Sequence, residues 1–185
     1  MPSRLLSVIA AVLALALPAS ASAELAPGAR APAFVARGAL AGKVFSVSLA
    51  QALKKGPVVL YFYPKAFTHG CTLEAHAFAE ASDDFRKAGA TVIGMSNDNL
   101  PTLQRFSREA CRDKFAVASA SPALIKAYDV DLTRGGQSTG QTRRTSYVIA
   151  RDGRIAHVHS DMDYKDHVRV TLAAVRKLQR GASAG

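Results

Sequence analysis

Short, continuous apolar runs alternate along this chain with longer segments in which apolar residues recur every three or four positions. Residues 58–63 form an unbroken apolar run between Gly56-Pro57 and Pro64. Such a run is typical of a strand that is buried on both faces of a sheet. The pattern predicts further strands around Phe34-Val35 and residues 44–47, and at residues 91–95, 115–118, 145–149 and 155–158.

Helical spacing is clearest over residues 70–87, where the apolar positions that share one face are Ala75, Phe78, Ala81 and Phe85. The pattern also predicts a helix at residues 100–110, a short helix at residues 121–128 and a closing helix with an apolar stripe at Val168, Leu172, Val175 and Leu178. Residues 131–142 are polar and rich in glycine, and we expect a loop there.

The order of these elements predicts the fold class. Residues 145–149 and 155–158 flank Asp152-Gly153, which is a strong signal for a β-hairpin. Strands that alternate with helices, followed by a hairpin and a last helix, indicate a three-layer α/β sandwich. This order fits a thioredoxin-like fold with an N-terminal extension. We expect one domain over residues 24–180, followed by a flexible tail at residues 181–185.

The amino terminus has the pattern of an export signal. Arg4 precedes an apolar run at residues 5–17, and Ala21-Ser22-Ala23 fits a signal-peptidase site. A retained membrane anchor is the alternative, but the run is shorter than the roughly 20 apolar residues that a spanning helix needs. We predict a cleaved signal peptide at residues 1–23, a mature chain that begins at Glu24 and is not attached to a membrane, and a secreted or periplasmic location.

The formal charge of +10 raises the question of an anionic partner. Basic pairs such as Lys54-Lys55 and Arg176-Lys177 are spread along the chain and are not interleaved with aromatic residues. This distribution favours a solvated basic surface over nucleic-acid binding.

Two cysteines, Cys71 and Cys111, are present. In an exported chain the ordinary expectation for such a pair is a structural disulfide. A domain of this size has a full hydrophobic core and does not depend on one cross-link. Whether each cysteine has a structural or a chemical role therefore has to be inferred from the residues around it.

Residues 61–75, YFYPKAFTHGCTLEA, resemble the active-site segment of peroxiredoxins. Pro64, Thr68 and Cys71 fill its P-x-x-x-T-x-x-C core, and the flanking residues resemble the bacterioferritin-comigratory, or Q-type, branch. The likeness extends over about residues 25–178. It implies a cofactor-independent thiol peroxidase that reduces hydrogen peroxide and organic hydroperoxides, with Cys71 as the attacking thiolate. It also implies that Pro64 shields the sulfur and that Thr68 hydrogen-bonds the thiolate or the peroxide.

Elementary physical chemistry agrees with this assignment. A helix amino terminus and a nearby cation both favour the thiolate form of a cysteine. Cys71 falls in the first turn of the predicted helix, where unpaired backbone N–H groups are available. Thr68 has a second possible role as the helix N-cap, with its hydroxyl accepting a hydrogen bond from the Cys71 amide.

The cation has to come from elsewhere in the chain. Arg143-Arg144-Thr145-Ser146-Tyr147 resembles the R-x-[ST]-F strand of the family, which places an arginine beside the sulfur. Arg144 is preferred over Arg143, because Tyr147 then takes the aromatic position. Glu74, one turn beyond Cys71, either orients a basic side chain or lies on the surface.

Oxidised Cys71 requires a resolving partner. Many Q-type members carry a resolving cysteine five residues after the first, where this chain has His76. Cys111 resembles the other arrangement of the branch, in which the resolving thiol lies near the end of the next helix. The resemblance implies an intramolecular disulfide, recycling by a thioredoxin-like or other dithiol reductant, and a monomer or weak dimer.

Two other functions and a metal site agree less well with the sequence. A thioredoxin-like thiol–disulfide redox protein without peroxidase activity normally needs C-x-x-C, and Thr68 stands where the first cysteine would be. A non-catalytic exported domain cross-linked by its two cysteines is the other alternative. The histidine spacings, such as His157 and His159, match no recognised closed metal site, so no metal is expected.

Overall fold

A computed structural model describes residues 24–183 of the 185-residue chain. The predicted signal peptide lies outside the described residues. Within residues 24–183, no helix is both long enough and apolar enough to cross a membrane.

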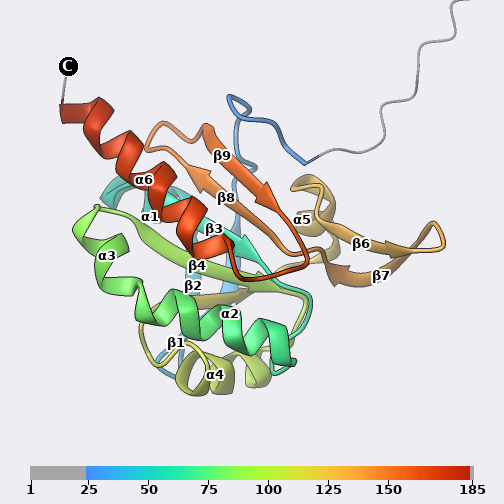
Figure 1. The fold of residues 1–185 in the computed structure, drawn as a ribbon. Helices are drawn as coiled ribbons and strands as arrows, with labels where there is room; N and C mark the ends of the chain where they lie inside the picture. The colour runs from blue at the N-terminus through green and yellow to red at the C-terminus, as the bar shows by residue number, and fades with distance from the viewer. Residues whose placement is uncertain (1–23, 184–185) are drawn as a thin grey trace, which may run out of the picture.

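The core of the molecule is a seven-stranded sheet in the order β2-β1-β5-β4-β3-β8-β9 (Figure 1). Strands β3, β4 and β5 are parallel, whereas β1 and β8 run antiparallel to their neighbours β5 and β3. All five residues of β3 are buried, as the apolar run predicted for a central strand. The strands are β1 Val35–Leu40, β2 Lys43–Ser48, β3 Val58–Phe62, β4 Thr91–Ser96, β5 Ala116–Ser119, β8 Thr145–Ile149 and β9 Ile155–Ser160.

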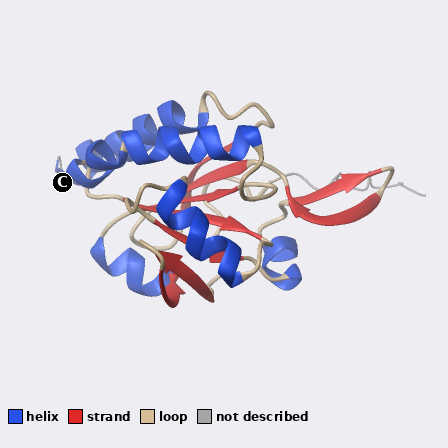
Figure 2. Ribbon diagram, turned by 90° about the horizontal axis from the view of Figure 1, so that it is seen from below, coloured by secondary structure: helices blue, strands red, loops and turns tan. Residues whose placement is uncertain are grey.

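Helices cover both faces of this sheet (Figure 2). They are α1 Leu49–Lys55, α2 His69–Glu80, α3 Ser82–Lys87, α4 Leu100–Glu109, α5 Pro122–Ala127 and α6 His167–Ser183. Tyr61 of β3 packs in one cluster with residues of α2, α3, α4 and α6, while Leu60 and Phe62 pack in a second cluster with residues of α1 and α5. The predicted three-layer, thioredoxin-like fold is therefore confirmed, and the β1–β2 hairpin and α1 form its N-terminal extension.

Two local expectations were wrong, and one helix was missed. The helix predicted over residues 70–87 is broken at Ala81 (φ −83°, ψ 0°), because Ser82, Asp83 and Asp84 start a new helix with acidic residues in its first turn. Residues 131–142 form a two-stranded ribbon, β6 Asp131–Arg134 and β7 Gln137–Thr142, instead of a loop. Helix α1, with Ser48 as its N-cap, was not predicted at all.

The sequence pattern did not predict the β6–β7 ribbon, and the reason is physical. Most of its side chains are exposed, so no apolar–polar alternation marks the strands. Gly135 and Gly136 both have positive φ (57° and 78°), as a two-residue hairpin turn requires. The ribbon projects away from the sheet (Figure 2). At the other end of the chain, α6 runs through residue 183 and so includes part of the segment predicted as a flexible tail.

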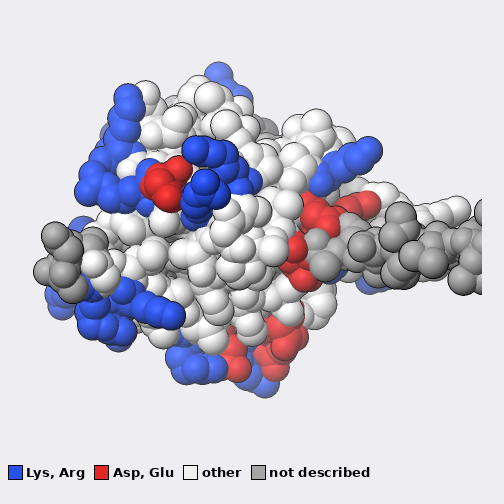
Figure 3. Space-filling model, turned by 90° about the horizontal axis from the view of Figure 1, so that it is seen from above, with Lys and Arg blue, Asp and Glu red and all other residues white. Residues whose placement is uncertain are grey.

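The basic residues are distributed in separate groups. On the face drawn in Figure 3, Lys and Arg do not form one continuous patch, and several lie beside Asp or Glu. Examples of such surface pairs are Arg86–Asp83 at 3.0 Å and Arg176–Asp84 at 3.5 Å. Exposed pairs of this kind contribute little to stability.

Candidate active site

Cys71 is the third residue of α2, in its first helical turn, and its side chain is only 1% exposed. Pro64 is the second residue after β3. Six residues separate the end of β3 from the start of α2. Backbone N–H groups of a first helical turn have no partner inside the helix and create a local positive potential. The fold therefore holds the sulfur where a negative charge is favoured, at the end of a strand buried on both faces.

Thr68 occupies the N-cap position of α2, but its side chain does not cap the helix. The Thr68 hydroxyl donates to the Lys65 carbonyl oxygen at 2.9 Å, so the expected bond from the Cys71 amide is not made. The Thr68 carbonyl instead accepts from the Thr72 amide at 2.9 Å. The lone pairs of the Thr68 hydroxyl oxygen remain as acceptors.

Arg144, immediately before β8, is the arginine that reaches the sulfur. Its Nη2 lies 3.4 Å from the Cys71 Sγ, its Nε donates to the Met162 carbonyl at 3.1 Å, and its Nη1 donates to Glu74. Arg143 points elsewhere, to Glu24 at 2.9 Å. Successive side chains of an extended segment point to opposite sides, so only one member of the pair can face α2.

The charge on Arg144 is held in place by its partners. Burial disfavours the guanidinium charge, but the negative charges of Glu74 and Cys71 raise the pKa of Arg144 above its ordinary value. Glu74 is completely buried, so its alternative role as a surface residue is excluded. A forked guanidinium can serve the thiolate and the carboxylate at the same time.

A histidine that the sequence analysis did not identify lies next to the ion pair of Arg144 and Glu74. His167, the first residue of α6, is completely buried, and its Nδ1 is 3.7 Å from Oε1 of Glu74. The same Nδ1 is 2.8 Å from the Ser146 hydroxyl, and Nε2 is 2.9 Å from the Asp161 carbonyl oxygen. A histidine at the start of an amphipathic helix carries no signal in the sequence that would connect it to residues 71–74.

Asp98 anchors the loop between β3 and α2 and was also missed. Its carboxylate accepts from the Ala66 amide at 2.7 Å and from the Ser96 hydroxyl at 2.8 Å. The next residue of the loop, Phe67, has φ 64° and is 38% exposed. Its ring packs edge-on against Phe106 with 5.2 Å between the ring centroids. A non-glycine residue at positive φ is strained and persists because the surrounding contacts determine it.

Cys111 lies two residues after the end of α4, is completely buried and is a free thiol, as is Cys71. Its amide donates to the Phe106 carbonyl at 3.0 Å. Burial raises the pKa of Cys111 far above that of an ordinary thiol, and Asp113 raises it further. The two cysteines belong to one hydrophobic cluster without being bonded to each other.

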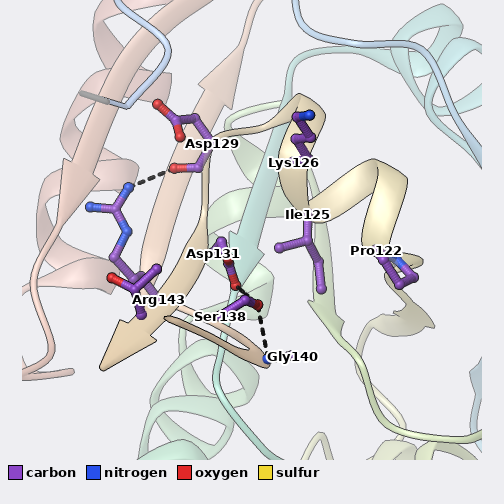
Figure 4. Close-up of a pocket in the computed structure, with 9 residues that line it drawn as sticks. Pro122, Ile125, Lys126, Asp129, Asp131, Ser138, Gly140 and Arg143 are labelled. Carbon is purple, nitrogen blue, oxygen red and sulfur yellow. Dashed lines mark hydrogen bonds between the residues drawn. The ribbon is translucent and has the colours of Figure 1, made fainter. Parts of the chain in front are cut away.

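A separate pocket of about 520 Å³ lies between α5 and the β6–β7 ribbon (Figure 4). It is lined by Pro122, Ile125, Lys126, Asp129, Asp131, Thr133, Ser138, Gly140 and Arg143. Because its lining contains Arg143 and none of Pro64, Thr68, Cys71 or Arg144, it is not the site of the thiol. Across the described part of the chain, no three His, Cys, Asp or Glu side chains are arranged to hold a metal ion.

Comparison with known proteins gives one consistent family. A family model described as the AhpC/TSA family matches residues 27–158. Peroxiredoxin Bcp of Escherichia coli strain K12 is 32% identical over 117 residues, which cover 62% of this chain and 75% of the relative. The chloroplastic peroxiredoxin Q of Oryza sativa subsp. japonica is 30% identical over 156 residues, which cover 84% of this chain and 69% of the relative.

Solved structures indicate the same family. Peroxidoxin BcpB from Mycobacterium tuberculosis superimposes with a TM-score of 0.73 at 28% identity, over 82% of this chain and 97% of that one. Peroxiredoxin Q from Xanthomonas campestris gives a TM-score of 0.68 at 27% identity, over 77% and 90% of the two chains. This chain therefore belongs to the AhpC/TSA family, as a peroxidase of the peroxiredoxin type similar to Bcp and peroxiredoxin Q.

Proposed function

We propose that this chain is an exported two-cysteine peroxidase in which Cys71 reduces hydrogen peroxide and organic hydroperoxides and Cys111 resolves the oxidised sulfur. The observation that carries the proposal is the Cys71 Sγ in the first turn of α2, 3.4 Å from Nη2 of the buried Arg144. A thiolate is the nucleophile in such chemistry, and a helix amino terminus together with a cation favours that form.

In the first step the Cys71 thiolate attacks the terminal oxygen of the hydroperoxide. An S–O bond forms, the O–O bond breaks, and the departing alkoxide or hydroxide takes up a proton. Arg144 and the amides at the start of α2 stabilise the negative charge that moves onto the oxygens. The Thr68 hydroxyl donates its own hydrogen to Lys65. Its oxygen is therefore free to accept a hydrogen bond from the bound peroxide, and we assign to Pro64 the shielding of the sulfur that the resemblance of residues 61–75 implies.

The second step joins the two sulfurs. The Cys111 thiol condenses with the Cys71 sulfenic acid to form a disulfide and release water. Both side chains are at most 1% exposed and the two thiols are not bonded to each other. We propose that local opening of the first turn of α2 and of the segment after α4 brings the sulfurs together. That segment contains two successive residues at positive φ, Arg112 (50°) and Asp113 (59°), which makes it a weak point of the fold.

Recycling requires an external reductant. We propose a dithiol of the thioredoxin type, which restores both thiols by disulfide exchange. No cofactor takes part, and the chain works as a monomer or weak dimer. A cleaved signal peptide at residues 1–23 is part of the proposal, and amino-terminal sequencing of the protein exported by its host tests it. A first residue of Glu24 is expected, and recovery of the intact Met1 terminus would contradict export by cleavage.

Mass spectrometry of the reduced mature protein after one equivalent of hydrogen peroxide tests the whole cycle. Rapid loss of two hydrogens, with Cys71 linked to Cys111, is the expected result. A sulfenic acid trapped on Cys71 without linkage would keep the peroxidase and remove Cys111 from the cycle. Thiols that remain unreacted would overturn the proposed function.

A further inference from the structure

We propose that His167 is a positioning residue for the peroxidase reaction, which holds residues 161–162 so that the Met162 carbonyl orients Arg144 toward Cys71. The proposal deepens the proposed function and rests on it, because it concerns the guanidinium that stabilises the thiolate. Both ring nitrogens of His167 bond to groups other than the sulfur, so His167 acts on the sulfur through Arg144.

The orientation of Arg144 depends on the chain segment 161–166, which connects β9 to α6. Nε of Arg144 donates to the Met162 carbonyl at 3.1 Å. Nη1 donates to Glu74, and Nη2 lies 3.4 Å from the Cys71 Sγ. Because the guanidinium is a planar and rigid fork, a bond that fixes Nε also fixes the directions of both Nη atoms. The position of the Met162 carbonyl therefore helps to set where the cation meets the sulfur.

Segment 161–166 buries little surface of its own. Five of its six residues are exposed, and Met162 is 52% exposed. Segments with few buried contacts open locally at a low cost in free energy. The hydrogen bonds that attach this segment to the buried part of the protein therefore determine its position.

His167 provides such an attachment. Its side chain is completely buried, with Nε2 2.9 Å from the Asp161 carbonyl oxygen and Nδ1 2.8 Å from the Ser146 hydroxyl. A carbonyl can only accept, so Nε2 carries a hydrogen, and in neutral His167 the Ser146 hydroxyl donates to Nδ1. Ser146 belongs to β8, all of whose residues are buried. The imidazole ring thus joins the exposed segment to a buried strand of the sheet.

Asp161 is the link between His167 and Arg144. Its amide donates to the Arg144 carbonyl at 3.2 Å, and its own carbonyl accepts from His167. With the peptide groups on both sides of Asp161 held in this way, the next carbonyl, that of Met162, faces Nε of Arg144. Loss of the His167 bond releases the second of these peptide groups. The Met162 carbonyl can then turn away, and Nη2 loses its fixed direction toward the sulfur.

Three substitutions of His167 test the inference. His167→Gln keeps an N–H donor at about the place of Nε2, His167→Asn keeps an amide at about the place of Nδ1 only, and His167→Leu keeps neither. Two properties of each reduced protein are measured: the rate constant of the reaction with hydrogen peroxide, and the pH titration of the thiolate by its ultraviolet absorbance. Cys111 does not contribute to this titration, because burial raises its pKa far above the range used.

The order of the three variants is the expected result. His167→Asn and His167→Leu should slow the peroxide reaction roughly two- to tenfold, which is the effect of one lost hydrogen bond. The midpoint of their thiolate titration should move to higher pH by the corresponding shift of about 0.3 to 1 unit. His167→Gln should lie closer to the wild type in both measurements. Equal values for His167→Gln and His167→Asn would overturn the proposal, even if His167→Leu does not fold.

A double-mutant cycle tests whether His167 acts through Arg144. In a protein that already carries Arg144→Met, His167→Asn should slow the peroxide reaction no further, because no guanidinium is left to be oriented. Additive losses would overturn the proposal, since they would show an effect of His167 that does not depend on Arg144.

Val175→Ala is the control for a loss of stability alone. Val175 is completely buried, lies on α6 as His167 does, and packs in the apolar cluster on that face of the sheet. This variant should have a lower free energy of unfolding but the thiolate titration of the wild type. A shift of the titration equal to that of His167→Asn would overturn the proposal, because any weakening of α6 would then have the same effect.

The titration needs no peroxide, so the inference and the proposed function can fail separately. Thiols inert to peroxide, in proteins whose thiolate titration still follows the expected order, would overturn the proposed function and support the role of His167. A normal peroxide reaction with the same rate and the same titration in all three variants of His167 would overturn the inference and leave the proposed function in place.

Discussion

Cys71 and Cys111 lie in the same hydrophobic cluster and are equally buried, but their surroundings differ in charge. Cys71 is at the start of a helix and contacts the guanidinium of Arg144 at 3.4 Å. Cys111 follows the end of a helix, where the dipole is negative, and Asp113 is the charged residue that affects it most. Burial alone therefore does not decide the reactivity of a thiol. The sign of the nearby charge distinguishes the sulfur of Cys71 from the sulfur of Cys111.

The largest expected effect comes from removing the attacking sulfur. Cys71→Ser should abolish peroxide consumption, because the remaining thiol is buried without a stabilising cation. Peroxide consumption by the reduced protein, followed with an excess of dithiol, measures this. Substantial peroxidase activity in this variant would mean that Cys111 reacts with peroxide by itself. That result would contradict the difference in reactivity between the two cysteines.

Removing the other sulfur should separate the two steps. Cys111→Ser should keep the rate of the first peroxide reaction and lose turnover with a dithiol reductant, because the sulfenic acid on Cys71 has no partner within the chain. Single-turnover and steady-state rates measured on the same preparation check this. Unchanged steady-state turnover would remove Cys111 from the cycle.

The contrast between the sites can be weakened by removing the cation. Arg144→Met should slow the first step roughly tenfold to a hundredfold, because a charge-assisted hydrogen bond contributes about 1.5–3 kcal/mol. Arg143→Met is the matched control, since Arg143 pairs with Glu24 away from the sulfur. Second-order rate constants with hydrogen peroxide compare the two. A larger loss in Arg143→Met would contradict the geometry of the site.

The smallest expected effect is on the pH dependence of stability. The pKa of His167 is lowered from 6.5 to about 4, so the unfolded state binds the extra proton and stability rises with pH across that window. The pKa of Glu74 is raised from 4.5 to about 8, so the folded state binds the extra proton and stability falls as pH rises. Between pH 4.5 and 6.5 the two contributions oppose each other in the wild type.

Single substitutions should expose each contribution. Relative to the wild type, Glu74→Gln should gain stability with rising pH between 4.5 and 6.5, and His167→Gln should lose it, by about 3 kcal/mol at most. Urea unfolding at several pH values measures both slopes. Parallel profiles for the two variants would show that neither group has the shifted pKa.

Much of the fold was predictable because local sequence patterns indicate its elements. The apolar run of β3, the stripe of α6 and the hairpin signal at Asp152-Gly153 each depend on residues that are near one another in sequence. The β6–β7 ribbon and α1 were not predictable in this way. The ribbon is polar and exposed, and α1 is a single short helix of seven residues whose formation depends on packing against the sheet.

For the site, the sequence by itself determined the thiol, its place in the first turn of a helix, and a choice between two arginines. These follow from a motif in one strand-to-helix segment and from a second short motif. Only the tertiary structure decided that Arg144 faces Cys71, that Glu74 is buried, and that His167 and Asp98 support the site. The reason is physical: these contacts join residues from 32 to 93 positions apart. The packing of α2 and α6 on one face of the sheet, beside β8, and the pairing of β3 with β4 bring these residues together.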